Sequence, residues 1–279
     1  MILTTAVLVV LAAAAVPDSA DDIMARVADN QDRAQEQRTA FVYHQNVLVR
    51  VKRSNGKLAR EEYAEYTVTP TASGSGKERT LFRGKYVDGR KEVAFDTPGF
   101  EHKNIDIDAE LAGSLLESFA NDRKSRDGIE HDLFPLTSRQ QAKYNFSLEG
   151  REDYRNTPVY RIRFAPKHTT LDDDEEDGGQ WQGEVLVDCN EYQPVLVTTF
   201  LAAHIPVWVK AALGTDVKQL GFKVTYKKFD QGLWFPVSYG GEFQLKVLFL
   251  YSRKVSVSMQ NSGFQRAQVD SNVTYGRIP

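Results

Sequence analysis

The sequence predicts an α+β fold that is mostly β: a curved antiparallel sheet of about eleven strands, open as a half-barrel, with about three helices covering its concave face. Many segments alternate apolar and polar residues with the period of a strand. Segments with helical periodicity are few, and successive strands lack the helical crossovers that a parallel sheet requires. A long antiparallel sheet with one apolar face, combined with few helices, favours a sheet wrapped around helices over a closed barrel.

The chain begins with an apolar segment. Every residue from Met1 to Val16 is apolar except Thr4 and Thr5. This run is shorter than the ~20 residues that a membrane-spanning helix needs, but it suits the core of a secretory signal. Small residues place the cleavage site after Ala15 or Ala20. The sequence therefore predicts a signal peptide over residues 1–20 and a single domain over 21–279, although the missing Lys or Arg before the apolar run leaves an uncleaved anchor as an alternative.

Three segments have helical spacing. Ser19 and Asp22 form a capping-box pattern before a helix that should end near Gln37. Apolar residues three and four apart predict a second helix between Ile107 and Phe119. A third should follow Pro206 within residues 202–213, where it would either pack on the sheet or form a movable lid.

Strands and turns account for most of the remaining chain. The turn residues Ser54-Asn55-Gly56 and Asp88-Gly89 predict tight hairpins, and a Gly/Ser-rich stretch from Ser73 to Gly76 predicts another turn. The expected strands include residues 41–53, 57–69, 81–87, a segment from Tyr144, 159–166, 185–188, 195–201, 222–229, 234–250 and 255–259.

Composition and motifs exclude several function classes. The net charge of -3 provides no general attraction for nucleic acid. The only cysteine, Cys189, cannot form an internal disulfide, and no two of the five histidines have the spacing of a helical zinc site. Nucleophile-elbow, phosphate-loop and dinucleotide-binding motifs are absent from the sequence. We therefore expect no catalytic residues, no metal and no cofactor.

Two charged segments have a functional and a simpler interpretation. Asp173, Glu175, Asp177 and Glu184 match the spacing of a calcium loop, but the flanking segments are strands, and a solvated acidic loop explains the same residues. The basic residues between Arg50 and Arg60 could dock on an anionic surface. A charged hairpin tip that keeps the sheet edge soluble is the simpler interpretation.

Several strand patterns, in this order, resemble those of a known superfamily. They are Val159-Tyr160-Arg161-Ile162-Arg163-Phe164-Ala165-Pro166, Gly183-Glu184-Val185-Leu186-Val187-Asp188 running into Tyr192-Gln193-Pro194-Val195, Tyr226-Lys227-Lys228-Phe229-Asp230, and Gly232-Leu233-Trp234-Phe235-Pro236. Together they are similar to the outer-membrane lipoprotein-sorting (LolA-like) superfamily of bacterial periplasmic proteins, over about Ala20 to Tyr275. The resemblance implies a periplasmic half-barrel whose apolar cavity takes acyl chains.

On that basis we expect a non-enzymatic, monomeric carrier of a lipid or an acylated lipoprotein, loaded and emptied by a membrane-associated partner. An envelope sensor or scaffold of the same fold, acting through protein contacts, is the alternative, and a hydrolase with an unrecognised site is a third. The cavity should be lined by one alternate set of strand residues, with Trp208 as a gate. The expected ligand-binding residues are Tyr160, Ile162, Phe164, Trp208, Phe222, Val224, Tyr226, Phe243, Leu245 and Val247.

Overall fold

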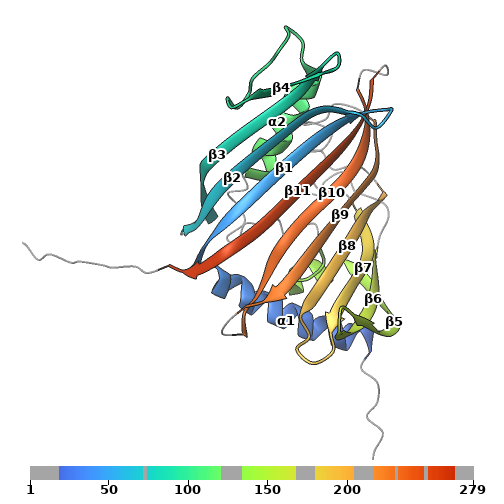
Figure 1. Ribbon diagram of the computed structural model, residues 1–279. Helices are drawn as coiled ribbons and strands as arrows, with labels where there is room; N and C mark the ends of the chain where they lie inside the picture. The colour runs from blue at the N-terminus through green and yellow to red at the C-terminus, as the bar shows by residue number, and fades with distance from the viewer. Residues whose placement is uncertain are drawn as a thin grey trace, which may run out of the picture.

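In the computed structural model, the eleven strands of the described residues belong to one open antiparallel sheet (Figure 1). The structure describes residues 19–71, 74–120, 134–167, 180–203, 216–229, 232–247 and 251–267. The strand order is β4-β3-β2-β1-β11-β10-β9-β8-β7-β6-β5, so β4 and β5 are the two edges and do not pair with each other. This confirms the predicted mostly-β fold with an open, half-barrel sheet.

The strands occupy the predicted segments, but β3, β7 and β9 begin five to seven residues earlier than predicted. The strands are β1 Phe41–Arg53, β2 Leu58–Thr71, β3 Gly74–Asp88, β4 Lys91–Phe95, β5 Tyr144–Tyr154, β6 Thr157–Pro166, β7 Gln180–Asp188, β8 Pro194–Ala203, β9 Asp216–Lys228, β10 Trp234–Val247 and β11 Tyr251–Arg266. The prediction of a turn at residues 73–76 was wrong, because Gly74 to Gly76 already pair with Thr69 to Thr71 of β2. The last strand is also longer than predicted, since β11 pairs with β1 along almost its whole length.

Three helices occur among the described residues: α1 Ala20–Arg38, α2 Ile107–Ala120 and α3 Ser138–Gln141. The predicted capping box at the start of α1 is confirmed, since the Ser19 side chain accepts from the Asp22 backbone N–H and the Asp22 side chain accepts from the Ser19 backbone N–H. The short α3 was not predicted. The helix expected within 202–213 lies, apart from its first two residues, outside the described residues, whereas Ala202 and Ala203 end β8.

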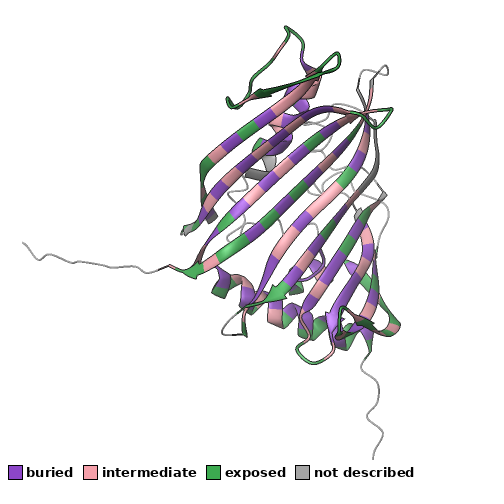
Figure 2. Ribbon diagram, in the orientation of Figure 1, coloured by how far each residue is buried: buried purple, intermediate pink, exposed green. Residues whose placement is uncertain are grey.

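The helices lie on one side of the sheet (Figure 1). α2 packs behind β1 and β2, and α1 runs along one end of the sheet near β5 to β10. Along most strands, buried residues alternate with half-buried and exposed ones (Figure 2), whereas the edge strand β4 has no buried residue. We call the helix-covered side the inner face and the other side the outer face.

The predicted signal peptide falls almost entirely on residues 1–18, which are outside the described part of the chain. Within the described ranges, no helix has both the length and the apolar content needed to cross a membrane.

Candidate functional site

The inner face carries the main buried apolar cluster of the described structure. Residues from β1, β2, β6 to β11 and both long helices join in one buried cluster. At its centre, Val49, Val257, Val224, Val197 and Val185 are each 0–2% exposed. Side chains of this kind make dispersion contacts and exclude water, the two properties by which a protein holds a hydrocarbon chain.

Eight of the ten predicted ligand-binding residues come together on this inner face. Tyr160, Ile162 and Phe164 share one side of β6, and the same side continues across the sheet in β9 and β10. The residues from those two strands are Phe222, Val224, Tyr226, Phe243 and Leu245, all buried in the same cluster. Their role in binding a ligand remains a prediction.

The other two predicted residues cannot be placed. Trp208, the proposed gate, lies outside the described residues. Val247 ends β10, and its backbone pairs with Tyr251 of β11, but its side chain is outside the described set.

Two inner-face residues that the sequence analysis missed carry polar atoms without partners. Trp181 on β7 and Thr199 on β8 are each 1% exposed, and neither Trp181 Nε1 nor Thr199 Oγ1 has a hydrogen-bond partner. Buried polar groups in proteins are almost always hydrogen-bonded, and leaving one unsatisfied costs about 1–3 kcal/mol. An indole N–H can only donate, whereas a hydroxyl can donate or accept. Both groups can therefore donate to an oxygen atom of a bound molecule.

The two groups lie in the same region of the inner face. In the sheet, β8 separates β7 from β9, and Thr199 pairs with Gly183 on one side and with Phe222 on the other. The rings of Trp181 and Phe222 have centroids 5.3 Å apart. Because neighbouring strands are about 4.8 Å apart, these rings must lean toward each other over β8, the strand that carries Thr199.

Sequence alternation alone contained a signal for Trp181 that was not used. Trp181, Gly183, Val185 and Val187 occupy alternate positions of β7, and the last two are fully buried. Extending the predicted strand back by four residues would have placed Trp181 on the inner face. Thr199 had no such signal, because a threonine on a strand is equally common on either face.

A glycine lets the aromatic residues pack at the centre of this face. A Cβ at Gly241 would lie 2.7 Å from Cδ1 of Phe222, so no larger residue fits there without moving the ring. With Gly241 in place, Phe222 stacks beside Tyr239 with a centroid distance of 5.4 Å. The aromatic part of the inner face therefore extends continuously from β7 to β10.

Polar contacts attach the helices around the edges of the inner face. Arg253 of β11 donates from Nε to Asp108 of α2 at 2.6 Å, and from a terminal nitrogen to the second carboxylate oxygen at 3.2 Å. At the other end of the sheet, Arg38 of α1 donates to the carbonyl of Trp234 at 3.0 Å. Asn30 of α1 donates to the carbonyl of Tyr192 at 3.0 Å. Among the described residues, the buried cluster of the inner face consists of apolar side chains.

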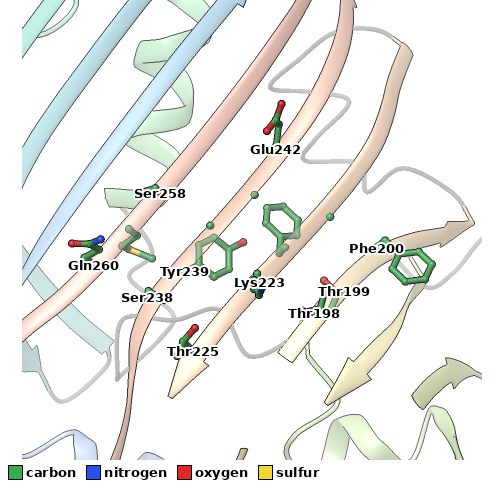
Figure 3. A pocket seen from close by; sticks show the side chains of 15 residues that line it. Thr198, Thr199, Phe200, Lys223, Thr225, Ser238, Tyr239, Glu242, Ser258 and Gln260 are labelled. Carbon is green, nitrogen blue, oxygen red and sulfur yellow. The ribbon is translucent and has the colours of Figure 1, made fainter. Parts of the chain in front are cut away.

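The outer face has a hollow of about 520 Å³ over β8 to β11 (Figure 3). Bare backbone at Gly221 and Gly240 forms part of its surface, and short hydroxyl side chains such as Thr198, Ser238 and Ser258 surround it. Phe200, 49% exposed, lies at one side. The charged residues Lys223 and Glu242 also line it, together with parts of Thr199 and Phe222 from the inner face. We do not assign a site to this hollow.

The remaining sequence candidates are less informative. Cys189 is partly buried, and burial raises the pKa of its thiol, which disfavours the reactive thiolate. The predicted acidic loop, Asp172 to Asp177, lies outside the described residues. In the described part of the chain, no three acidic, histidine or cysteine side chains are grouped as a metal site would require.

Comparison with solved structures finds proteins with a similar arrangement. A LolA superfamily protein from Nitrosomonas europaea is 11% identical with a TM-score of 0.38, over 91% of this chain and 96% of the other. A putative outer membrane lipoprotein-sorting protein domain from Vibrio parahaemolyticus is 12% identical with a TM-score of 0.38, over 86% and 90%. A DUF1329 family protein from Desulfovibrio piger is 12% identical with a TM-score of 0.37, over 91% and 95%.

No protein-family model matches the chain, and no curated protein matches it.

Proposed function

We propose that the protein is an exported, non-enzymatic carrier that holds the acyl chain of a lipid or an acylated lipoprotein against the inner face of its sheet. The observation that carries this proposal is the buried apolar cluster of the inner face, which contains two donors without hydrogen-bond partners, Trp181 Nε1 and Thr199 Oγ1. An acyl chain joined to a carbonyl group matches both features, because its hydrocarbon part can contact the apolar side chains and its carbonyl oxygen can accept from the two donors.

The apolar part of the interaction is large enough to hold cargo without specific chemistry. Burial of a chain of about 14 carbons at ~0.8 kcal/mol per methylene corresponds to a gross transfer free energy of order 10 kcal/mol. Loss of translational and rotational freedom offsets a large share of this gain. A micromolar or tighter affinity is therefore compatible with hydrophobic contacts alone.

The polar part would fix the position of the cargo. The Trp181 N–H and the Thr199 hydroxyl would both donate to the ester or acid carbonyl oxygen, and the hydrocarbon would extend along the neighbouring valine and aromatic side chains. Satisfying two buried donors favours an acyl ester or acid over a plain alkane.

The carrier would act in the periplasm, reached through the predicted signal peptide. Of the two predicted cleavage sites, Ala15 is the better one, because cleavage after Ala20 would remove Ser19, the N-cap of α1, together with the first residue of the helix. Mass spectrometry of the mature protein should therefore give Val16 as its first residue. A mature chain that begins at Asp21 would contradict this choice, and an intact Met1 would contradict cleavage itself.

The proposal is tested by calorimetric titration of the purified, delipidated protein with myristate. We expect saturable binding of one to a few molecules per chain. Thr199→Val keeps the shape of the side chain but removes the hydroxyl, so it should weaken myristate binding about three- to tenfold.

The matched control is Thr198→Val. Thr198 is the adjacent residue on β8 and belongs to the outer face, so its substitution should leave myristate affinity unchanged. Absence of binding by the wild-type protein would contradict the carrier proposal. Equal effects of the two substitutions would contradict the role of Thr199 only.

A further inference from the structure

A second cleft lies between α2 and the sheet edge formed by β2 and β3. It has a volume of about 560 Å³, which is within the range of small-molecule sites. Glu62, Tyr66 and Phe82 from the inner face line it on the sheet side, and Gly113 and Leu116 line it on the α2 side. This edge of the inner face is therefore hollow in the described structure, and it contains a buried charge.

Glu62 is the unusual group in this cleft. Its side chain is 1% exposed, and its Oε1 accepts from Arg60 Nε at 2.7 Å. Its Oε2 is buried and has no hydrogen-bond partner. Burial raises the pKa of Glu62 in spite of the contact with Arg60, because the ionised carboxylate lacks solvation on that side.

The terminal nitrogens of Arg60 lie close to groups other than Glu62, and one of them, Nη1, forms no hydrogen bond. One terminal nitrogen donates to the carbonyl of Phe100 at 2.5 Å, and the other lies 3.5 Å from Asp106 Oδ2. Its guanidinium also lies over the ring of Phe95 at 4.5 Å. A single guanidinium therefore faces two buried carboxylates, those of Glu62 and Asp106.

Asp106 differs from Glu62 because both of its oxygens are occupied. Oδ1 accepts from the backbone N–H of Ala109 at 3.2 Å, and Oδ2 accepts from the backbone N–H of His102 at 3.3 Å. Glu62 Oε2 is thus a buried acceptor of this network without a hydrogen-bond partner, and Arg60 Nη1 is a buried donor without one. Of these two residues, Glu62 lines the cleft.

We propose that this cleft binds a ligand through a primary ammonium group that donates to Glu62 Oε2. The charges around the cleft agree with a cation: Glu101, Glu110 and Glu117 join Glu62 in the lining, against Lys77 and Arg79. The apolar walls at Phe82 and Leu116 contact the carbon skeleton of the ligand. This inference does not depend on the acyl-carrier proposal, because it concerns a different cleft and a different ligand group.

An organic ammonium fits the cleft better than a metal ion does. The described residues contain no group of three metal-ligating side chains, whereas a hard cation requires about six oxygen ligands. The cleft is also much larger than an ion and its bound water need, since a water takes about 30 Å³. A primary ammonium needs one strong acceptor and tolerates an apolar wall for the attached carbons.

The test measures the affinity of benzylamine for the full protein by calorimetric titration. Benzyltrimethylammonium has the same charge but no N–H, so it should bind at least tenfold more weakly. Glu62→Gln should also weaken benzylamine binding at least tenfold, while it leaves Arg60 and Asp106 as a balanced pair. Equal affinities of the two ammonium compounds, or an unchanged affinity in Glu62→Gln, would overturn the proposal.

Gly113 provides a second test that does not change the charge network. A Cβ added at Gly113 would meet nothing within 4 Å, so a larger side chain can extend into the cleft. Gly113→Phe should abolish benzylamine binding, and the matched control Gly113→Ala should retain it. Binding that survives Gly113→Phe in a folded protein would place benzylamine elsewhere and overturn the proposal.

Lysophosphatidylethanolamine distinguishes a lipid source of the ammonium from a soluble amine. If it binds more tightly than benzylamine and is equally sensitive to Glu62→Gln, the natural ligand is a lipid head group. If benzylamine binds more tightly, the ligand is a small soluble amine. Myristate binding should be unchanged in Glu62→Gln, so failure of this inference and failure of the carrier proposal can be told apart.

Discussion

At the scale of single residues, the two proposed binding sites rest on polar atoms that are buried and have no hydrogen-bond partner. Trp181 Nε1 and Thr199 Oγ1 lie in an apolar surface, and Glu62 Oε2 lies in a charged cleft. Each is costly to an empty protein. Such groups are explained most simply as parts of binding sites whose ligands supply the missing partners.

This cost leads to a stability prediction for Thr199→Val. If the hydroxyl has no hydrogen-bond partner in the lipid-free protein, its removal should raise the free energy of unfolding by about 1 kcal/mol. Thermal and urea denaturation of the delipidated protein would measure the change, with Thr198→Val as the control. A clear loss of stability in Thr199→Val would mean that the hydroxyl already has a partner.

Residue-scale burial is also where the sequence analysis was least accurate. Arg60 was interpreted as part of a basic hairpin tip, but its side chain is 1% exposed. It pairs with Val51, and a register shift between Val51 and Lys52 separates it from the exposed tip. A local pattern cannot predict such a shift, because the register depends on packing against α2 and the 95–106 segment.

At the scale of elements, α2 is attached to the sheet by apolar packing and by the bidentate ion pair between Asp108 and Arg253. Arg253 and Asp108 are only 15% and 14% exposed, and their contact joins the first turn of α2 to β11. Charged hydrogen bonds with little exposure contribute more than surface pairs do.

Asp108→Asn should therefore lower the free energy of unfolding by about 1.5–3 kcal/mol, because it weakens both bonds to Arg253. Denaturation by urea would measure this change. Glu61→Gln is the control, since the Arg50–Glu61 pair has side chains 44% and 21% exposed and should contribute about 1 kcal/mol or less. Similar losses in the two variants would show that the ion pair does not anchor α2.

At the scale of the whole molecule, alternation and turn chemistry predicted most of the sheet. Val47, Val49 and Val51 are all buried on one side of β1, as their spacing of two required. The predicted turns at Ser54-Asn55-Gly56 and Asp88-Gly89 are both present, with positive φ at Gly56 and Gly89. The order of strands, and above all the pairing of β1 with β11, joins the two ends of the described chain and could not be derived from local patterns.

The candidate site was predictable only in part for a related reason. Periodicity predicted that Tyr160, Phe222 and Phe243 would each belong to a set of alternate strand residues that shares one face. The sheet brings all three residues to the inner face. Which alternate set faces inward was a guess at the sequence level. Trp181 and Thr199 gain their significance from missing partners, which only three-dimensional coordinates reveal.

The central claim, that the inner face accommodates an acyl chain, is tested most directly by native mass spectrometry of the mature protein purified from envelope extract without detergent. We expect a mass increment that corresponds to one acyl lipid or one acylated peptide per chain, and its loss after delipidation. A protein that arrives without lipid, fails to take up myristate, and is found with a stoichiometric protein partner would contradict the carrier and favour an envelope sensor or scaffold.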